Sequence, residues 1–212
     1  MNQNNSGFMS AIPLVTRNLL IINVLVWLAQ SLLGTTGDYI TYYGALFPVG
    51  SGHFMPHQIV TYMFLHGGLS HLFFNMFAVF MFGRTLEMVW GPKRFLIYYM
   101  LTGIGAGLTQ LLVCHLTGSF YPTVGASGAV FGILVAFGMM FPNSELFIIP
   151  FPFPIKAKWF VIGYGLLELG LGISNNAADN VAHFAHLGGL ITGVIILLFW
   201  RKKGQSNGSF HR

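Results

Sequence analysis

Residues 181–200 read VAHFAHLGGLITGVIILLFW, a stretch of 20 residues without a charged side chain. A helix needs about 20 consecutive, mostly apolar residues to cross the hydrocarbon core of a bilayer, and this stretch meets that requirement. It also contains two histidines, and ionisable side chains within a membrane are costly enough to indicate a function. The stretch therefore predicts a membrane-spanning helix that carries part of a functional site.

Five further apolar ranges precede this helix and predict the rest of the fold: 18–33, 70–83, 95–116, 127–141 and 159–173. All nine prolines lie outside the six ranges, as expected of helix interiors. The chain of 212 residues is 54% apolar and 7% charged, whereas an ordinary soluble domain has about 25% charged residues. The composition therefore excludes a soluble globular domain. We expect an all-α fold, a polytopic bundle of six transmembrane helices, with the proline-rich segment 141–158 as an interfacial loop.

The ten basic residues occur only in alternate loops and at the termini. They are Arg17, Arg84, Lys93, Arg94, Lys156, Lys158, Arg201, Lys202, Lys203 and Arg212. Because positively charged loops stay on the cytoplasmic side, both termini are expected in the cytoplasm. We expect a cytoplasmic N-terminal segment (1–17), a six-helix membrane domain (18–200) and a cytoplasmic tail (201–212). The net charge of +5 is then a topological signal, and no nucleic-acid partner is needed to explain it.

One alternative concerns the first span. Arg17, the apolar run after it and the segment Ala29-Gln30-Ser31 are also compatible with a secretory signal peptide and its cleavage site. Cleavage would leave an odd number of spans without improving the placement of the basic residues after the second span. A retained first helix is therefore the favoured interpretation.

Polar residues gather near the outer ends of the spans that run from outside to inside. The second span opens with His71 and Asn75, which share one helix face because they are four residues apart. The fourth span opens with Ser127. The sixth span contains His186, about 7–8 Å below its start at the helical rise per residue. A hydroxyl, two imidazoles and an amide are therefore expected at one depth.

These side chains are of the types that acyl transfer requires. A serine hydroxyl needs an adjacent base, and we expect His186 to serve Ser127 because an imidazole titrates near neutral pH. The oxyanion needs preorganised donors. We expect them from the first amide groups of the fourth helix and from His71 and Asn75.

Small residues and one aromatic ring are expected to shape this site. Glycine lets a substrate backbone or a neighbouring membrane helix approach closely. The glycines concerned are Gly125, Gly128, Gly132, Gly189 and Gly193, of which the last four form one G-x-x-x-G in the fourth span and one in the sixth. Phe131 lies one turn below Ser127 on the same face and is expected to pack on the imidazole of His186.

Four motifs together resemble the rhomboid family of intramembrane serine proteases. They are His71-Leu-Phe-Phe-Asn75, Glu87 before Gly91, Gly125-Ala-Ser-Gly128 and His186-Leu-Gly-Gly-Leu-Ile-Thr-Gly193. The resemblance covers about residues 58–200. It implies a nucleophile at Ser127 and a base at His186 acting as a dyad, with His71 and Asn75 in the oxyanion site.

The resemblance also implies a substrate class and a location. Substrates would be single-span membrane proteins cut near the outer face of the lipid bilayer, and the reaction would need neither metal nor cofactor. A bacterial-type member would lie in the inner (plasma) membrane. Two features depart from the family. Phe131 stands where many relatives have tyrosine, and the Trp-Arg pair of some relatives is absent from residues 34–57.

The remaining polar residues have simpler interpretations. His183 is expected to be structural or to line the mouth of the site, while His53, His57 and His66 are expected to be solvated or interfacial. Cys114 is the only cysteine, which excludes an intramolecular disulfide and any zinc site built on several cysteines.

Three acidic residues have no clear place in the predicted catalytic site. Glu168 in the fifth span should be paired or protonated, but the sequence identifies no partner. Asp179 would be the third member of a triad, which the seven residues between it and His186 and an intervening helix start disfavour. Glu87 is expected to form a local pair with Arg84.

Two hypotheses from other classes compete with the protease. A non-catalytic binder of transmembrane helices on the same scaffold predicts the loss of Ser127 or His186, and both are present. A histidine-ligated haem protein or metal transporter needs facing histidine pairs, and the chain has neither an H-E-x-x-H motif nor a carboxylate cluster for a metal.

Overall fold

Each of the six predicted spans is helical in the computed structural model of the chain, which describes residues 11–147, 153–174 and 182–206. The corresponding elements are α1 (Leu14–Leu32), α4 (Leu69–Ala78) continued by the π-helical η4 (Val79–Gly83) and by α5 (Arg84–Trp90), α6 (Pro92–Thr117), α7 (Ser127–Met140), α8 (Ala157–Ser174) and α9 (His183–Ser206). The prediction of an all-α membrane helix bundle is confirmed. The largest boundary differences are the second span, which continues to Trp90, and α9, which continues to Ser206.

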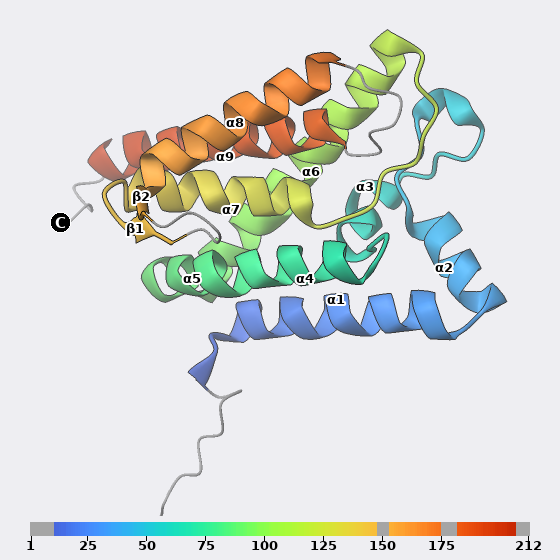
Figure 1. Cartoon of the computed structure of the whole chain (residues 1–212), viewed down its shortest axis with the longest axis horizontal. Helices are drawn as coiled ribbons and strands as arrows, with labels where there is room; N and C mark the ends of the chain where they lie inside the picture. Colours follow the sequence, from blue (N-terminus) through green and yellow to red (C-terminus); the bar gives the residue numbers. More distant parts are fainter. Residues whose placement is uncertain (1–10, 148–152, 175–181, 207–212) are drawn as a thin grey trace, which may run out of the picture.

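Within the described residues, four helical segments are long and apolar enough to cross a membrane: Leu14–Leu32, Leu69–Trp90, Pro92–Thr117 and His183–Lys203. Helix α7 is apolar but has only 14 residues, so it is about 21 Å long at the helical rise per residue. The hydrocarbon core is about 30 Å thick. One end of α7 therefore lies inside the thickness of the bundle, between α4 on one side and α8 and α9 on the other (Figure 1).

Helix α6 is bounded by residues that suit its two ends. Pro92 occupies the first turn, where the missing N–H costs nothing because that group has no partner within the helix. Gly118 ends the helix with a φ of 69°, a left-handed conformation that favours glycine. These signals fix a 26-residue helix, which packs against both α7 and α9.

Helices α6, α7 and α9 form the tightly packed centre of the bundle. A methyl group on Gly189 would overlap the carbonyl oxygen of Gly128, and one on Gly193 would approach the Cα of Gly132 at 3.3 Å. Gly189 and Gly193 of α9 therefore face α7. Gly128 and Gly132 of α7 also face α6, where Thr102 lies against Gly132. Small residues thus let three helices approach closely, as membrane helices commonly do.

The basic residues lie at one end of the bundle. The nine Lys and Arg among the described residues belong to the start of α1, to α5 and the start of α6, to β2 and the start of α8, and to the end of α9. Figure 1 shows these segments at the end where the C-terminus is marked. The charge segregation expected from the sequence is thus a property of the folded bundle.

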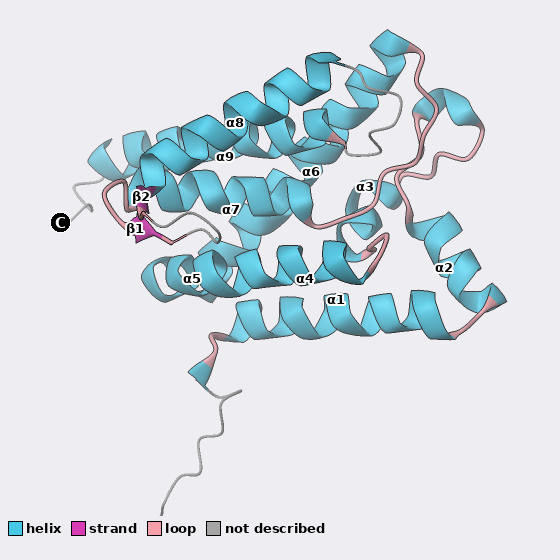
Figure 2. Ribbon diagram, in the orientation of Figure 1, coloured by secondary structure: helices cyan, strands magenta, loops and turns pink. Residues whose placement is uncertain are grey.

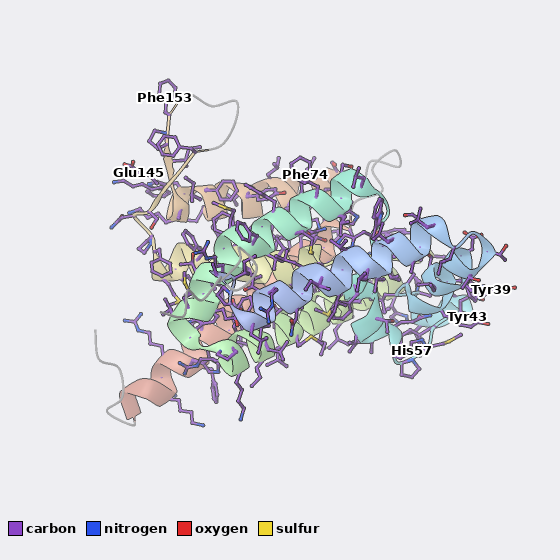
Figure 3. All side chains as sticks on the ribbon, turned by 90° about the horizontal axis from the view of Figure 1, so that it is seen from below. Tyr39, Tyr43, His57, Phe74, Glu145 and Phe153 are labelled. Atoms are coloured by element: carbon purple, nitrogen blue, oxygen red, sulfur yellow. The ribbon has the colours of Figure 1, made fainter. Side chains whose placement is uncertain are left out.

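A hairpin occupies part of the segment predicted as an interfacial loop. Strands β1 (Glu145–Leu146) and β2 (Ile155–Lys156) pair antiparallel, with Glu145 opposite Lys156. Figure 3 shows Glu145 and Phe153 projecting from the bundle at this end. The prolines of this segment are compatible with a short strand pair, and helix α8 begins at Ala157 directly after it.

The segment between α1 and α4 folds at the opposite end, where Figure 3 shows Tyr39, Tyr43 and His57 together. We name it the first outer loop after its expected side of the membrane. It contains α2 (Thr35–Gly44), η2 (Val49–Ser51), α3 (Gln58–Thr61) and η3 (Tyr62–Phe64). The buried amide of Gln58 holds it together, because Oε1 accepts from the N–H groups of Phe47 and Met55 at 3.3 and 3.1 Å. The sequence had not identified Gln58 as an organiser of this loop.

Glu87 anchors the start of α1. Its side chain is 3% exposed and accepts from the N–H groups of Val15 and Thr16 at 2.9 and 2.7 Å, and from Thr16 Oγ1 at 2.7 Å. The first N–H groups of a helix have no intrahelical partner, and a negative charge there is favourable. The expected pair with Arg84 is therefore wrong, because the carboxylate faces α1 while the guanidinium lies 6.0 Å from the centre of the Phe80 ring.

Replacing Glu87 with glutamine should destabilise the bundle by about 1–3 kcal/mol, because buried N–H groups lose a charged acceptor. Thermal unfolding in detergent micelles measures this as a lower Tm for Glu87→Gln. The matched control is Glu145→Gln, since Glu145 is exposed in the hairpin. Equal Tm values for the two variants would contradict the anchoring role.

One added methyl group at the glycine contact between α7 and α9 should also lower the stability of the bundle. Gly189→Ala should lower stability by about 1–3 kcal/mol through overpacking, measured as Tm in the same micelles. Gly170→Ala in α8 is the control, because a Cβ there meets nothing within 4 Å. The close contact would be refuted if Gly189→Ala unfolded at the temperature of the control.

Candidate active site

The loop before α7 is tied to the first outer loop by backbone hydrogen bonds. Leu46 and Thr123 form a bridge in which each N–H donates to the other's carbonyl at 2.9 Å. Two residues further along, the N–H of Gly125 donates to the carbonyl of Tyr62 at 2.9 Å. Figure 2 shows this loop running from the end of α6 past the outer-loop segments to the start of α7. The outer loop therefore fixes where α7 begins.

Gly125 brings the backbone against the imidazole of His71. It has a φ of 128°, and a Cβ at this position would lie 2.7 Å from Cε1 and Nε2 of His71. The positive φ favours glycine, and any side chain here would displace the ring of His71. His71 of α4 is thereby placed beside the start of α7. The neighbouring Asn75 is buried, and its Nδ2 donates to the carbonyl of His71 at 3.0 Å.

Ser127 and His186 are in direct contact. The Oγ atom of Ser127, the first residue of α7, lies 2.8 Å from Nε2 of His186 in the first turn of α9. The ring of Phe131 stacks on that of His186, with centroids 4.5 Å apart and an interplanar angle of 11°. The contact depends on the glycine packing of α7 against α9. A hydroxyl hydrogen-bonded to an imidazole is the arrangement that activates a serine nucleophile.

Glu168 joins the same cluster from α8. Its Oε2 lies 2.9 Å from Nδ1 of His186 and 2.6 Å from Nδ1 of His183. The carboxylate is 4% exposed, so it is paired inside the bundle, as a carboxylate at this depth requires. His183 is buried beside it. Sequence reasoning had found no partner for Glu168, and Asp179 lies outside the described residues.

His66 is a neutral member of the site's surroundings. The expectation that it is solvated or interfacial is wrong, because its ring is buried and packs against that of His71 with centroids 5.1 Å apart. Burial first, and the neighbouring His71 second, lower the pKa of His66 to about 4. The ring is therefore uncharged at neutral pH and adds no positive charge to the site.

The donor atoms of Glu168, His183 and His186 all lie within 4.8 Å of one another. Two imidazoles and a carboxylate form a ligand set that zinc accepts. Here, however, the imidazole nitrogens already lie within hydrogen-bond distance of the carboxylate. A metal bound by the same atoms would replace those hydrogen bonds.

Comparison with known proteins places the chain in a family. Residues 53–203 match the Rhomboid domain. The chain is 34% identical over 137 residues to rhomboid protease GluP of Bacillus subtilis, covering 64% of this chain and 24% of that protein. It is 32% identical over 148 residues to the putative rhomboid protease YdcA of the same organism, covering 67% and 70%.

A plant relative matches over a longer stretch. Rhomboid-like protein 11, chloroplastic, of Arabidopsis thaliana is 28% identical over 191 residues, covering 84% of this chain and 62% of the relative. Several relatives are much longer, and the match spans 24%, 41% and 40% of three of them. The domain match nevertheless extends over most of this chain, and the membrane helix bundle agrees with it. The chain belongs to the rhomboid family.

Proposed function

We propose that the protein is an intramembrane serine endopeptidase with Ser127 as nucleophile and His186 as general base. The observation that carries the proposal is the 2.8 Å contact between Ser127 Oγ and His186 Nε2 within an apolar bundle. Two of the similar proteins are named as rhomboid proteases, one of them putatively. Substrates are single-span membrane proteins cut near the outer face of the bilayer.

The proposed reaction is acyl transfer in two halves. Ser127 Oγ attacks the scissile carbonyl carbon while its proton moves to Nε2 of His186. The protonated imidazole then donates that proton to the leaving amine, and an acyl-enzyme remains. A water molecule, deprotonated by the same nitrogen, then attacks the ester carbonyl carbon. As the bond from this carbon to Ser127 Oγ breaks, the imidazolium returns the proton to Oγ, so the acid is released and the serine hydroxyl is regenerated.

Three sources of hydrogen-bond donors surround the place where the oxyanion forms. The first N–H groups of α7 have no partner within the helix, and the imidazole of His71 lies against Gly125. Asn75 uses one hydrogen of its amide on the carbonyl of His71, which leaves the second for a ligand. Donors held in advance stabilise the developing charge more than mobile ones do. We assign the oxyanion site to this group.

The short α7 helix explains how water and substrate meet inside the membrane. Its 14 residues leave the serine end below the outer surface but short of the bilayer centre, since the hydrocarbon core is about 30 Å thick. Water reaches that depth from the outer side. The proposed orientation has the basic end of the bundle and both termini in the cytoplasm of a bacterium, and the proposed chemistry uses no metal or cofactor.

Purified protein should cleave a single-span model substrate, and Ser127→Ala and His186→Ala should each reduce kcat/KM by at least about 10³-fold, because loss of either member disables the unit. A fluorophosphonate probe should label wild type and fail to label Ser127→Ala. The control is Ser174→Ala, which removes an exposed hydroxyl at the end of α8.

The alternative of a non-catalytic binder predicts a different result. It would bind the model substrate with equal affinity in wild type and Ser127→Ala, without cleavage in either. Cleavage at one rate by wild type, Ser127→Ala and His186→Ala would likewise overturn the proposed assignment.

A further inference from the structure

We propose that Glu168 is a positioning residue that orients His186 and stabilises its protonated form, so that Ser127, His186 and Glu168 work as a triad. This inference rests on the proposed function. The resemblance to the family implies a dyad, and the third group here comes from α8 rather than from the disfavoured Asp179. The observation behind this inference is the position of the His186 ring, which has the hydroxyl of Ser127 at Nε2 and the buried carboxylate of Glu168 at Nδ1.

The carboxylate selects the tautomer that catalysis needs. An ionised carboxylate only accepts hydrogen bonds, so Nδ1 of His186 carries the proton that it donates to Glu168 Oε2 at 2.9 Å. In the neutral ring, Nε2 then has the free lone pair, and it faces Ser127 Oγ at 2.8 Å. The side chain of Glu168 thus points the basic nitrogen at the nucleophile, as the acid of a serine protease triad does.

The stacking of Phe131 on His186 does not by itself determine which ring nitrogen faces Ser127. The phenyl ring of Phe131 lies nearly parallel to the imidazole of His186 and fixes the plane of that ring. An apolar surface does not distinguish the two nitrogens, because it offers neither donor nor acceptor. The hydrogen bond to Glu168 supplies the missing direction. Since Phe131 has no hydroxyl of its own, the carboxylate is the polar group on the Nδ1 side of the ring in the described structure.

A second imidazole holds the carboxylate in place. Nδ1 of His183 lies 2.6 Å from the same Oε2 atom, so the oxygen accepts from two rings, one on each of its lone pairs. Tyr164, one turn earlier on α8, packs on Phe131 with ring centroids 4.7 Å apart. In the part of the chain that the structure describes, the titratable groups beside the pair are His183 and Tyr164, and His71 of α4 lies on the Ser127 side.

The charge of Glu168 is needed most when His186 is protonated. During attack, the proton leaves Ser127 Oγ and binds Nε2, while the proton on Nδ1 stays where it is. The imidazolium then lies in an apolar bundle, where a lone cation is costly. The carboxylate at 2.9 Å balances that charge without accepting the proton.

The test compares Glu168→Gln with wild type in detergent or in vesicles. Glutamine keeps the size but removes the charge, so kcat should fall by about 10²–10⁴-fold while KM changes little. Glu168→Asp, which keeps the charge, should recover part of the lost kcat. Glu145→Gln, an exposed acid in the hairpin, should match wild type.

A spectroscopic measurement covers the case in which Glu168→Gln fails to fold. In wild type, the Nδ1 proton of His186 should give a strongly downfield proton resonance that is coupled to a labelled ring nitrogen. Its assignment to Nε2 instead of Nδ1 would overturn the proposal. So would a folded Glu168→Gln variant within about threefold of the wild-type kcat, since neutralising the acid of a triad lowers kcat by far more than that.

The outcomes separate this proposal from the proposed function. Loss of cleavage in Ser127→Ala with normal cleavage in Glu168→Gln would overturn the triad alone. Failure of wild type to cleave or to be labelled would overturn the protease, while the histidine resonance would still test the hydrogen bond. Stoichiometric zinc in the purified protein, with activity lost to a chelator, would make Glu168, His183 and His186 a metal site and overturn the positioning role.

Discussion

The contact between two glycines, Gly128 on α7 and Gly189 on α9, is the constraint on which the site depends. Neither residue has a side chain, so the backbones of the two helices meet directly, and any Cβ on Gly189 would overlap a carbonyl oxygen. At this separation, Ser127 Oγ and His186 Nε2 lie within hydrogen-bond distance. The packing of α6 against α7 and α9 holds the two helices at this separation. The distance between the side chains of Ser127 and His186 is therefore set by two glycines that have no side chain.

The chain has only five acidic residues. Of the four that the structure describes, the two buried ones each connect separate helices. Glu87 on α5 accepts three hydrogen bonds from the start of α1, and Glu168 on α8 accepts from two histidines of α9. In an apolar bundle, dispersion and close packing give little direction to helix association. A carboxylate whose hydrogen-bond donors lie on another helix determines which faces of the two helices pack together, because a packing that separates them leaves the carboxylate unpaired.

Hydropathy and proline placement were enough to predict all six helices, because each signal lies within one segment. Counting residues from helix starts also predicted that Ser127 and His186 lie at one depth. The same count applied to Glu168, six residues before the end of α8, would have pointed to a similar depth. It could not identify the neighbour, because helix order and rotation in a bundle depend on contacts distant in sequence. The anchoring of α1 by Glu87, the burial of His66 and the role of Gln58 were missed for that reason.

The length of α7 has a consequence for where a substrate is cut. The helix extends about 21 Å from its end near the basic residues to Ser127, and that distance does not change with the surrounding lipid. A substrate helix lying alongside adjusts its tilt and height to the thickness of the bilayer. Under the proposed function and orientation, α7 would therefore set a fixed distance from the inner face. The bond presented to Ser127 would then depend on the number of substrate residues between that face and the serine.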